Sequence, residues 1–177
     1  AGLLRVFTFL RRDPVSREDD IARIAAQEAT LVFPRFDLDT AWALGAGLRD
    51  AALARKAPLA IDVSLRDRPL FHVALPGSTG ENTDWLRRKR NTVLHFSKSS
   101  YGIGLALAAK GETLEAKHGL PTRDYAAHGG GFPLLVKGLG CIGAVTVSGL
   151  PQRQDHVLVV EALALVLGKE LDDLALG

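Results

Sequence analysis

Apolar and polar positions follow two periods along the chain, and these periods predict a mixture of helices and strands. Apolar side chains recur every three or four residues from Ser16 to Phe33 and again from Leu38 to about Lys56, as they do on one face of a helix. Acidic residues follow Ser16, and Asp37 can cap the second segment, both of which are helix-start signals. Pro34 ends the first predicted helix.

On both sides of Arg66-Asp67-Arg68, apolar side chains occupy every second position, which predicts a β-hairpin. If Leu65 pairs with Pro69, the register places Asp62 directly opposite His72 on the more polar face. A neighbouring carboxylate would raise the pKa of His72 and fix the orientation of its ring. The alternative is an ordinary polar pair across two strands with no chemical role.

The second half of the chain predicts further helices, a second hairpin and a final apolar helix. Because Ile103, Leu105 and Leu107 alternate, the segment after Ser100 is also compatible with a strand. The predicted elements are helices from Asn82 or Thr83 to about Phe96, from Tyr101 to Lys110 and up to His118, strands Phe132–Val136 and Cys141–Ser148, and a helix from Pro151 to about Gly168.

Length and composition indicate one globular domain. The chain has 177 residues, of which 47% are hydrophobic and 24% charged, values typical of a domain that buries a substantial core. We assign residues 13–177 to this domain and residues 1–12 to an N-terminal extension or arm. The arm lacks the features of a signal peptide, and no apolar run reaches the roughly 18 residues of a membrane helix.

Charge and cysteine content narrow the expected partners and location. The formal net charge is +2, so no excess of one sign favours nucleic acid or membranes, and we expect neither as a partner. Cys141 is the only cysteine, which rules out an internal disulfide and suits the reducing cytoplasm.

A basic run, Arg87 to Arg90, lies within the helix predicted to end near Phe96. Without an aromatic platform or an excess of positive charge, a solvated helix face is favoured over a nucleic-acid surface. A narrower interpretation is that Lys89, Arg90 or Asn91 turns inward to meet a carboxylate or phosphate on a small ligand.

The stretch from Tyr125 to His156 is the best candidate for a binding site. Three glycines follow His128 and allow close backbone approach, and the helix after Pro151 offers free N–H groups at its N-terminus. His128 is a candidate haem or metal ligand or general acid/base, or it ties the loop by hydrogen bonds. Asp155 and His156 are candidates on the final helix, although Asp155 also suits a helix N-terminus structurally.

Several blocks of residues together resemble the haem-degrading-domain, HbpS-like family, which includes relatives of GlcG and of the C-terminal domain of PduO. The resemblance covers roughly Ile21 to Leu167, and the blocks are Trp85-Leu86-Arg87-Arg88-Lys89-Arg90-Asn91, Ser99-Ser100-Tyr101, Asp124-Tyr125-Ala126-Ala127-His128-Gly129-Gly130-Gly131-Phe132-Pro133, Val147-Ser148-Gly149-Leu150-Pro151-Gln152 and Asp155-His156.

The resemblance implies an α+β fold, a profilin-like α-β-α sandwich with an antiparallel sheet and helices on both sides. It also implies a homo-oligomer, and a pocket surrounded by the glycine block, Ser148-Gly149 and Asp155. Haem is the cofactor that the family suggests, although the sequence has no Cys-x-x-Cys-His attachment motif.

We therefore expect a protein that binds haem or another anionic, tetrapyrrole-like ligand in a glycine-lined pocket. The alternative is a homo-oligomeric interaction scaffold without catalysis. No metal site is expected, since His128, His156 and Asp155 lack the spacing of a zinc ligand pair. The candidate ligand-binding residues are Lys89, Arg90, Asn91, Tyr101, His128, Gly129, Gly130, Ser148, Gly149, Asp155 and His156.

Overall fold

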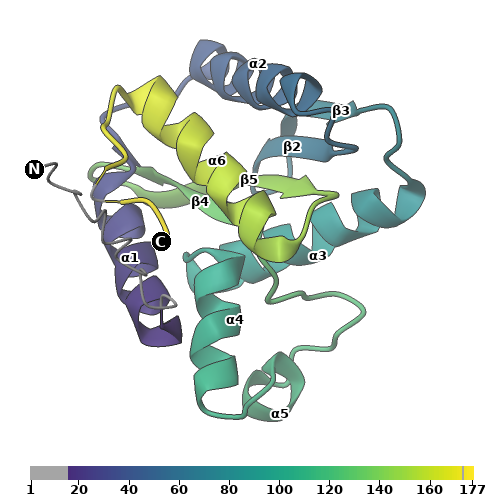
Figure 1. Ribbon diagram of the computed structural model, residues 1–177, viewed down its shortest axis with the longest axis vertical. Helices are drawn as coiled ribbons and strands as arrows, with labels where there is room; N and C mark the ends of the chain where they lie inside the picture. Colours follow the sequence, from purple (N-terminus) through teal and green to yellow (C-terminus); the bar gives the residue numbers. More distant parts are fainter. Residues whose placement is uncertain (1–15, 173) are drawn as a thin grey trace, which may run out of the picture.

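The computed structural model describes residues 16–172 and 174–177, so the predicted arm, residues 1–12, lies outside the described residues. Helices and strands are interspersed along the chain (Figure 1). Their bounds are α1 Arg17–Thr30, β1 Val32–Phe33, α2 Leu38–Ala54, β2 Ala60–Leu65, β3 Pro69–Ala74, α3 Gly80–Phe96, α4 Ser100–Ala109, α5 Leu114–His118, β4 Gly131–Val136, β5 Gly140–Ser148 and α6 Gln152–Leu167.

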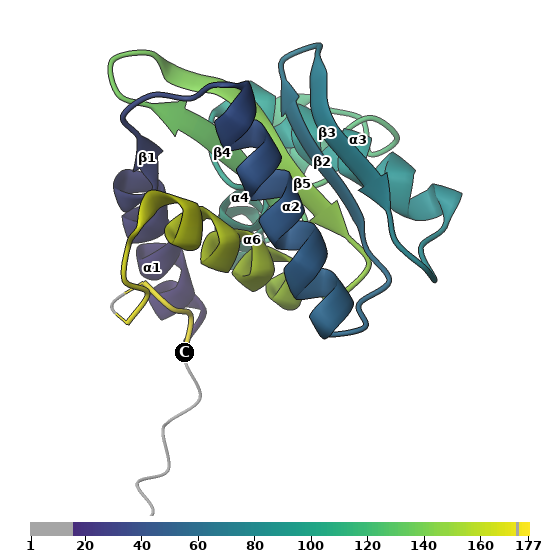
Figure 2. The ribbon, with the colours of Figure 1, turned by 90° about the horizontal axis from the view of Figure 1, so that it is seen from above.

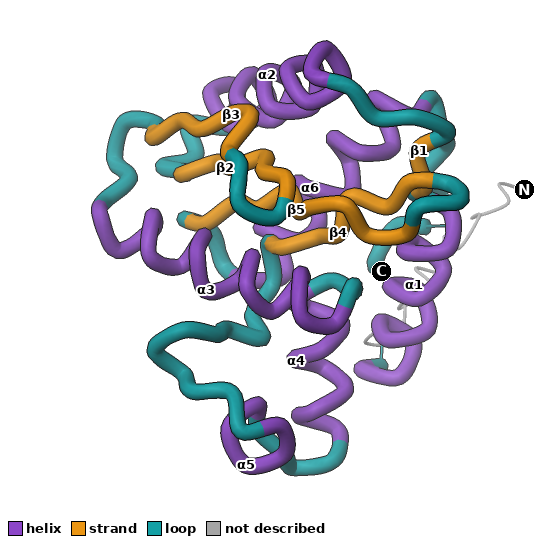
Figure 3. The backbone as a smooth tube through the Cα atoms, turned by 180° about the vertical axis from the view of Figure 1, so that it is seen from behind, coloured by secondary structure: helices purple, strands orange, loops and turns teal. Residues whose placement is uncertain are grey.

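The described strands form one sheet in the order β1-β4-β5-β2-β3, drawn in orange in Figure 3. Every pairing is antiparallel except that of β1, which runs parallel to β4. Asp62 lies opposite His72, as predicted, but Pro69 pairs with Ser64 and not with Leu65. An irregularity between Val63 and Ser64 absorbs the one-residue difference near the turn.

Helices cover both faces of the sheet, which confirms the predicted α-β-α sandwich. α2 and α6 lie on one face and α3 on the other (Figure 2). Alternation along β2 produces this division: Ile61 and Val63 belong to the apolar core beneath α2 and α6, whereas Asp62 contacts Arg90 of α3. α4, α5 and the loop leading to β4 extend beyond the end of the sheet (Figure 1).

The first predicted helix is too long at its C-terminal end. α1 stops at Thr30, and Val32 and Phe33 form β1 beside Leu135 and Val136 of β4. A β-branched and an aromatic residue suit a strand, and pairing with a distant segment outweighs the local helical period. The segment after Ser100, whose sequence was compatible with either a helix or a strand, is the helix α4.

Candidate functional site

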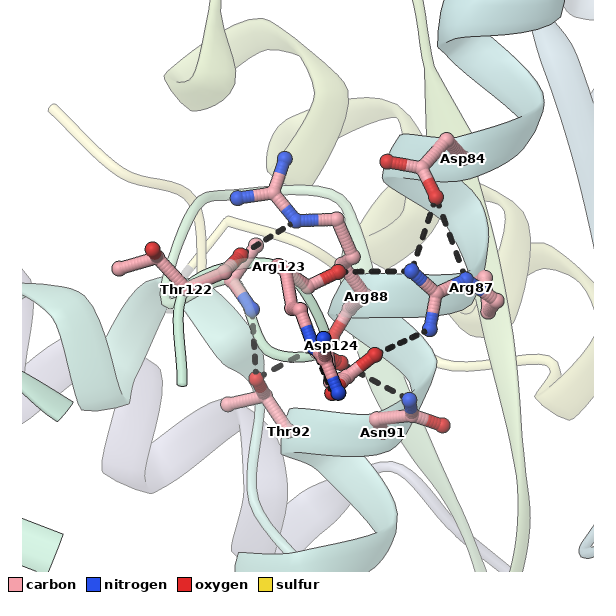
Figure 4. Close-up of polar contacts among 9 residues, drawn as sticks. Asp84, Arg87, Arg88, Asn91, Thr92, Thr122, Arg123 and Asp124 are labelled. Carbon is pink, nitrogen blue, oxygen red and sulfur yellow. Dashed lines mark hydrogen bonds and ion pairs between the residues drawn. The ribbon is translucent and has the colours of Figure 1, made fainter. Parts of the chain in front are cut away.

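The basic run of α3 bonds to other parts of the chain. Arg87 and Arg88 donate to the carbonyls of Arg123 and Thr122, and Asn91 donates to the carbonyl of Asp124 (Figure 4). The hydroxyl of Thr92 also accepts a hydrogen bond from the N–H of Ala126. These bonds fix the loop after α5 against α3, and His128 follows directly on this loop.

Lys89 turns in another direction and forms a buried ion pair with Asp155. Nζ of Lys89 lies 3.0 Å from Oδ2 of Asp155 and 3.0 Å from the carbonyl oxygen of Val147. Oδ1 of Asp155 accepts a hydrogen bond from the N–H of Leu150 at 3.1 Å. Burial lowers the pKa of Lys89, against the opposing effect of Asp155, and burial raises the pKa of Asp155. The pair joins α3 to the first turn of α6.

A cavity of about 300 Å³ opens beside this ion pair, and we call it the polar cavity. Ser148 and Gly149 bring the end of β5 into its wall, and α6 contributes its first residues. Ser148 is 4% exposed, and its hydroxyl has no hydrogen-bond partner among the residues that the structure describes. The complete lining is Glu81, Asn82, Trp85, Lys89, His128, Ser148, Gly149, Leu150, Gln152 and Asp155.

A second hollow, of about 440 Å³, lies between α4, α5 and the loop, and we call it the apolar hollow. Tyr101 lines this hollow and not the polar cavity. Its wall is mainly aliphatic and aromatic, with a few charged groups: Arg17, Arg88, Tyr101, Gly104, Leu105, Leu107, Ala108, Glu112, Thr113, Leu114, Thr122, Tyr125, Ala126, Ala127, His128 and Gln152.

His128 lines both hollows. Its ring packs edge-on against Trp85 with centroids 5.0 Å apart, and the guanidinium of Arg88 lies 4.3 Å from the centre of the Trp85 ring. Burial lowers the pKa of His128, and the charges of Lys89 and Arg88 lower it further. The imidazole is therefore neutral at pH 7, and its ring has no hydrogen-bond partner within the described part of the chain.

The glycines after His128 let the loop pack closely against α6 and the end of β5. A Cβ on Gly129 would lie 1.9 Å from the carbonyl oxygen of Gln152, and one on Gly130 would lie 2.4 Å from that of Val147. The N–H of Gly129 donates to the Gln152 side chain. Neither of these two glycines lines the polar cavity, whereas Gly149 does. Gly129 and Gly130 instead allow the His128 loop to approach its neighbours closely.

His156 is buried away from both hollows. It is 1% exposed, and its Nε2 lies 2.8 Å from Oε1 of Gln27. Burial lowers the pKa of His156 to about 3, so the ring is neutral. Gln27 in turn donates to the carbonyl of Leu174, and the three residues join α6, α1 and the C-terminal segment.

The three neighbours Lys89, Arg90 and Asn91 do not converge. Lys89 borders the polar cavity, Asn91 supports the loop, and Arg90 reaches Asp62 of β2, with Nη1 3.1 Å from Oδ2. Successive residues on a helix point about 100° apart, so a run of three samples most of a turn.

Sequence reasoning missed Trp85 and Gln152 as parts of the site. Trp85 precedes Lys89 by four residues, which puts both side chains on one face of α3. That spacing was the available signal. Gln152 meets the loop only because the glycines allow the close approach, which no local pattern predicts.

Comparison with known proteins places this arrangement in a family. A model of the family described as "Haem degrading protein HbpS-like" matches residues 36–164. The chain belongs to the HbpS-like family. A UPF0303 protein of Paraburkholderia phymatum is 60% identical over 158 residues, which cover 89% of this chain and 96% of the relative. One of Rhizobium rhizogenes is 58% identical over 160 residues, covering 90% and 98%.

Solved structures share the fold of this HbpS-like chain. The Ybr137w protein superimposes with a TM-score of 0.76 at 30% identity, over 89% of this chain and 90% of its own. HbpS gives 0.60 at 21% identity, covering 76% and 91%, and a PduOC:Heme complex gives 0.64 at 16% identity, covering 73% and 93%. At these two lower identities the likeness concerns the fold alone.

No group of three or more His, Cys, Asp or Glu in residues 16–172 and 174–177 is arranged to hold a metal ion. No helix within the same residues is long and apolar enough to cross a membrane.

Proposed function

We propose that this HbpS-like protein binds a small anionic ligand with a flat apolar body, of which haem is the leading example. The apolar hollow would take the body, and His128 would supply a ligand to the iron. The observation that carries the proposal is the position of His128, a neutral imidazole that borders both the apolar hollow and the polar cavity.

The composition of the apolar hollow fits this class of ligand. Leu105, Leu107 and Leu114 offer aliphatic contacts for a macrocycle, and Arg17 and Arg88 offer positive charge for its carboxylates. A neutral imidazole has the free lone pair that iron requires. When bound, haem supplies a redox-active, Lewis-acidic iron, and the residues of this chain orient it and control access to it.

The polar cavity supports binding of the more polar end of the ligand. Ser148 offers a hydroxyl without a partner, and the first turn of α6 offers backbone N–H groups. The Lys89–Asp155 pair behind them is nearly neutral as a unit, and it would hold the cavity wall in shape. A carboxylate in this cavity would lie beside His128, Ser148 and Gly149.

Titration with haemin, followed by Soret absorbance, tests the proposal. We expect saturable binding of one haemin per chain. His128→Ala should raise the dissociation constant at least about tenfold, the effect of losing about 1.4 kcal/mol. His118→Ala is the matched control, because His118 is exposed on α5 and lines neither hollow.

Nonsaturable absorbance changes would contradict the proposal. So would equal affinities for the wild type and both variants, because the position of His128 would then have no bearing on the ligand. Far-ultraviolet circular dichroism of each variant separates loss of binding from loss of fold.

Exposed apolar residues on α2 support a second candidate, a homo-oligomeric scaffold. Leu38 is 58% exposed and Trp42 is 66% exposed, and Trp42 packs edge-on against Phe71 of β3. Exposed apolar patches of this kind suit contact with another subunit. Light scattering after gel filtration should give the wild type a molar mass greater than that of one chain, and Trp42→Lys should lower this mass. A monomeric wild type would contradict this candidate.

A further inference from the structure

A third hollow, of about 570 Å³, lies on the side of α3 that faces β2 and β3, and we call it the edge hollow. Asp62, His72 and Arg90 line it, and it shares no lining residue with the polar cavity or the apolar hollow. We infer that the edge hollow is a second binding site, for a small organic oxyanion such as a carboxylate or a phosphate monoester, held by Arg90 and His72.

Asp62 fixes both of these side chains. It is 2% exposed, and its Oδ2 accepts hydrogen bonds from Nη1 of Arg90 at 3.1 Å and from the hydroxyl of Ser64 at 2.6 Å. Its other oxygen, Oδ1, lies 3.3 Å from Nδ1 of His72. Arg90 and His72 are therefore held on the two oxygens of one buried carboxylate.

The guanidinium of Arg90 keeps a free edge. Nη1 bonds to Asp62 and Ser64, whereas Nε and Nη2 have no partner among the described residues. This Nε–Nη2 edge is the planar fork that binds both oxygens of a carboxylate or phosphate. Because its other side is already bonded, the fork is oriented before any ligand arrives.

Arg87 shows the contrast within the same hollow. Its Nε and Nη2 donate to Asp84, Nη1 donates to Asp124, and Nη2 also reaches the carbonyl of Arg123. Arg87 therefore has no free fork, and it offsets the charge of Asp84, which also lines the edge hollow. Arg90 is the guanidinium that remains available there.

His72 adds a second polar contact. A carboxylate can only accept, so Nδ1 of His72 carries the proton that is shared with Asp62. Nε2 is left for a ligand, and the side chain is 44% exposed at the hollow. An oxyanion on Arg90 that also carries a hydroxyl, such as the P–O–H of a phosphate monoanion or the alcohol of a hydroxy acid, can therefore donate a hydrogen bond to Nε2.

Nuclear magnetic resonance titrations with inorganic phosphate and with acetate, at constant ionic strength, test this site. We expect saturable shifts of the Arg90 Nε–H and the His72 ring with at least one anion. Arg90→Lys keeps the charge but lacks the fork, and it should weaken binding at least about tenfold. Arg68→Gln removes a nearby exposed charge and should leave the affinity unchanged.

His72→Asn should also weaken the binding of phosphate severalfold, because it removes the Nε2 acceptor, and it provides a test if Arg90→Lys does not fold. Equal affinity in the wild type and Arg90→Lys, or weakening by Arg68→Gln alone, would show general charge attraction and overturn the inference. The absence of saturable shifts, or shifts centred on the His128 ring, would overturn it as well. The haemin titration is independent of these outcomes, because its residues line other hollows.

Discussion

At the residue scale, His156 makes stability depend on pH. Its pKa is lowered from 6.5 to about 3 by burial, so between these values the unfolded chain binds a proton that the native chain does not. The free energy of unfolding should therefore fall as the pH drops, by up to about 1.4 kcal/mol per pH unit once the unfolded histidine is protonated.

Urea denaturation of His156→Gln between about pH 5.5 and pH 7 checks this expectation, because histidines are the main side chains that titrate in the unfolded chain over this range. The variant should be less stable at pH 7 but lose less stability on acidification than the wild type. His118→Gln should retain the slope of the wild type. Equal slopes for all three proteins would contradict a buried, neutral His156.

The Lys89–Asp155 pair is the second residue-scale feature with a measurable consequence. Lys89→Met should destabilise the protein by about 3 to 5 kcal/mol, because it leaves the carboxylate of Asp155 buried without its partner. The double variant Lys89→Met/Asp155→Leu should lose less free energy of unfolding than the sum of the losses in the two single variants, as a double-mutant cycle would measure. Additive costs would mean that the two charges do not interact.

At the element scale, the glycines after His128 determine how the loop meets α6. Gly129→Ala would place a methyl group 1.9 Å from the carbonyl oxygen of Gln152, so backbone must move. We expect a loss of at least about 2 kcal/mol and weaker haemin binding.

Gly47→Ala provides the matched control for this substitution. Gly47 lies in α2, and no heavy atom lies within 4 Å of the position that an alanine methyl group would take there. Alanine should therefore stabilise the helix by about 0.5 to 1 kcal/mol. Thermal unfolding of both variants measures the difference. A stable Gly129→Ala variant with unchanged binding would contradict the close packing of the loop on α6.

Local sequence signals predicted most elements well. Ser16, Asp37 and Ser99 cap α1, α2 and α4 through side-chain hydrogen bonds to the backbone, as their residue types lead one to expect. The short strand β1 was missed because only its pairing with β4 distinguishes it from the end of a helix. The irregularity beside Ser64 also depends on tertiary contacts.

At the scale of the whole molecule, the sheet and its two helical layers bring distant segments to one end of the fold. α3, the loop carrying His128, the end of β5 and the start of α6 meet there. The sequence predicted that one binding site contains Lys89, His128, Ser148, Gly149 and Asp155, since all of them occur in the blocks that resemble the HbpS-like family. It could not separate the polar cavity from the apolar hollow, because the boundary between them is made by side-chain packing around His128 and Gln152.

The packing of the layers also explains why some predicted ligand-binding residues lie away from the polar cavity and the apolar hollow. Arg90 lies on the edge-hollow side of α3, and His156 is enclosed between α6 and α1. A motif alone does not fix the direction in which each side chain points, because that direction depends on the layers packed around it. Residues adjacent in the sequence thus serve different hollows.

Nuclear magnetic resonance can show where on the protein the ligand binds. We would record amide and methyl spectra during titration with gallium protoporphyrin, a diamagnetic analogue of haem. We predict saturable shifts centred on Leu105, Leu114, Tyr125 and His128, with little change on α2 and β3. Shifts centred on Trp42 and Phe71, or no saturable shifts, would contradict the assignment of the apolar hollow as the binding site.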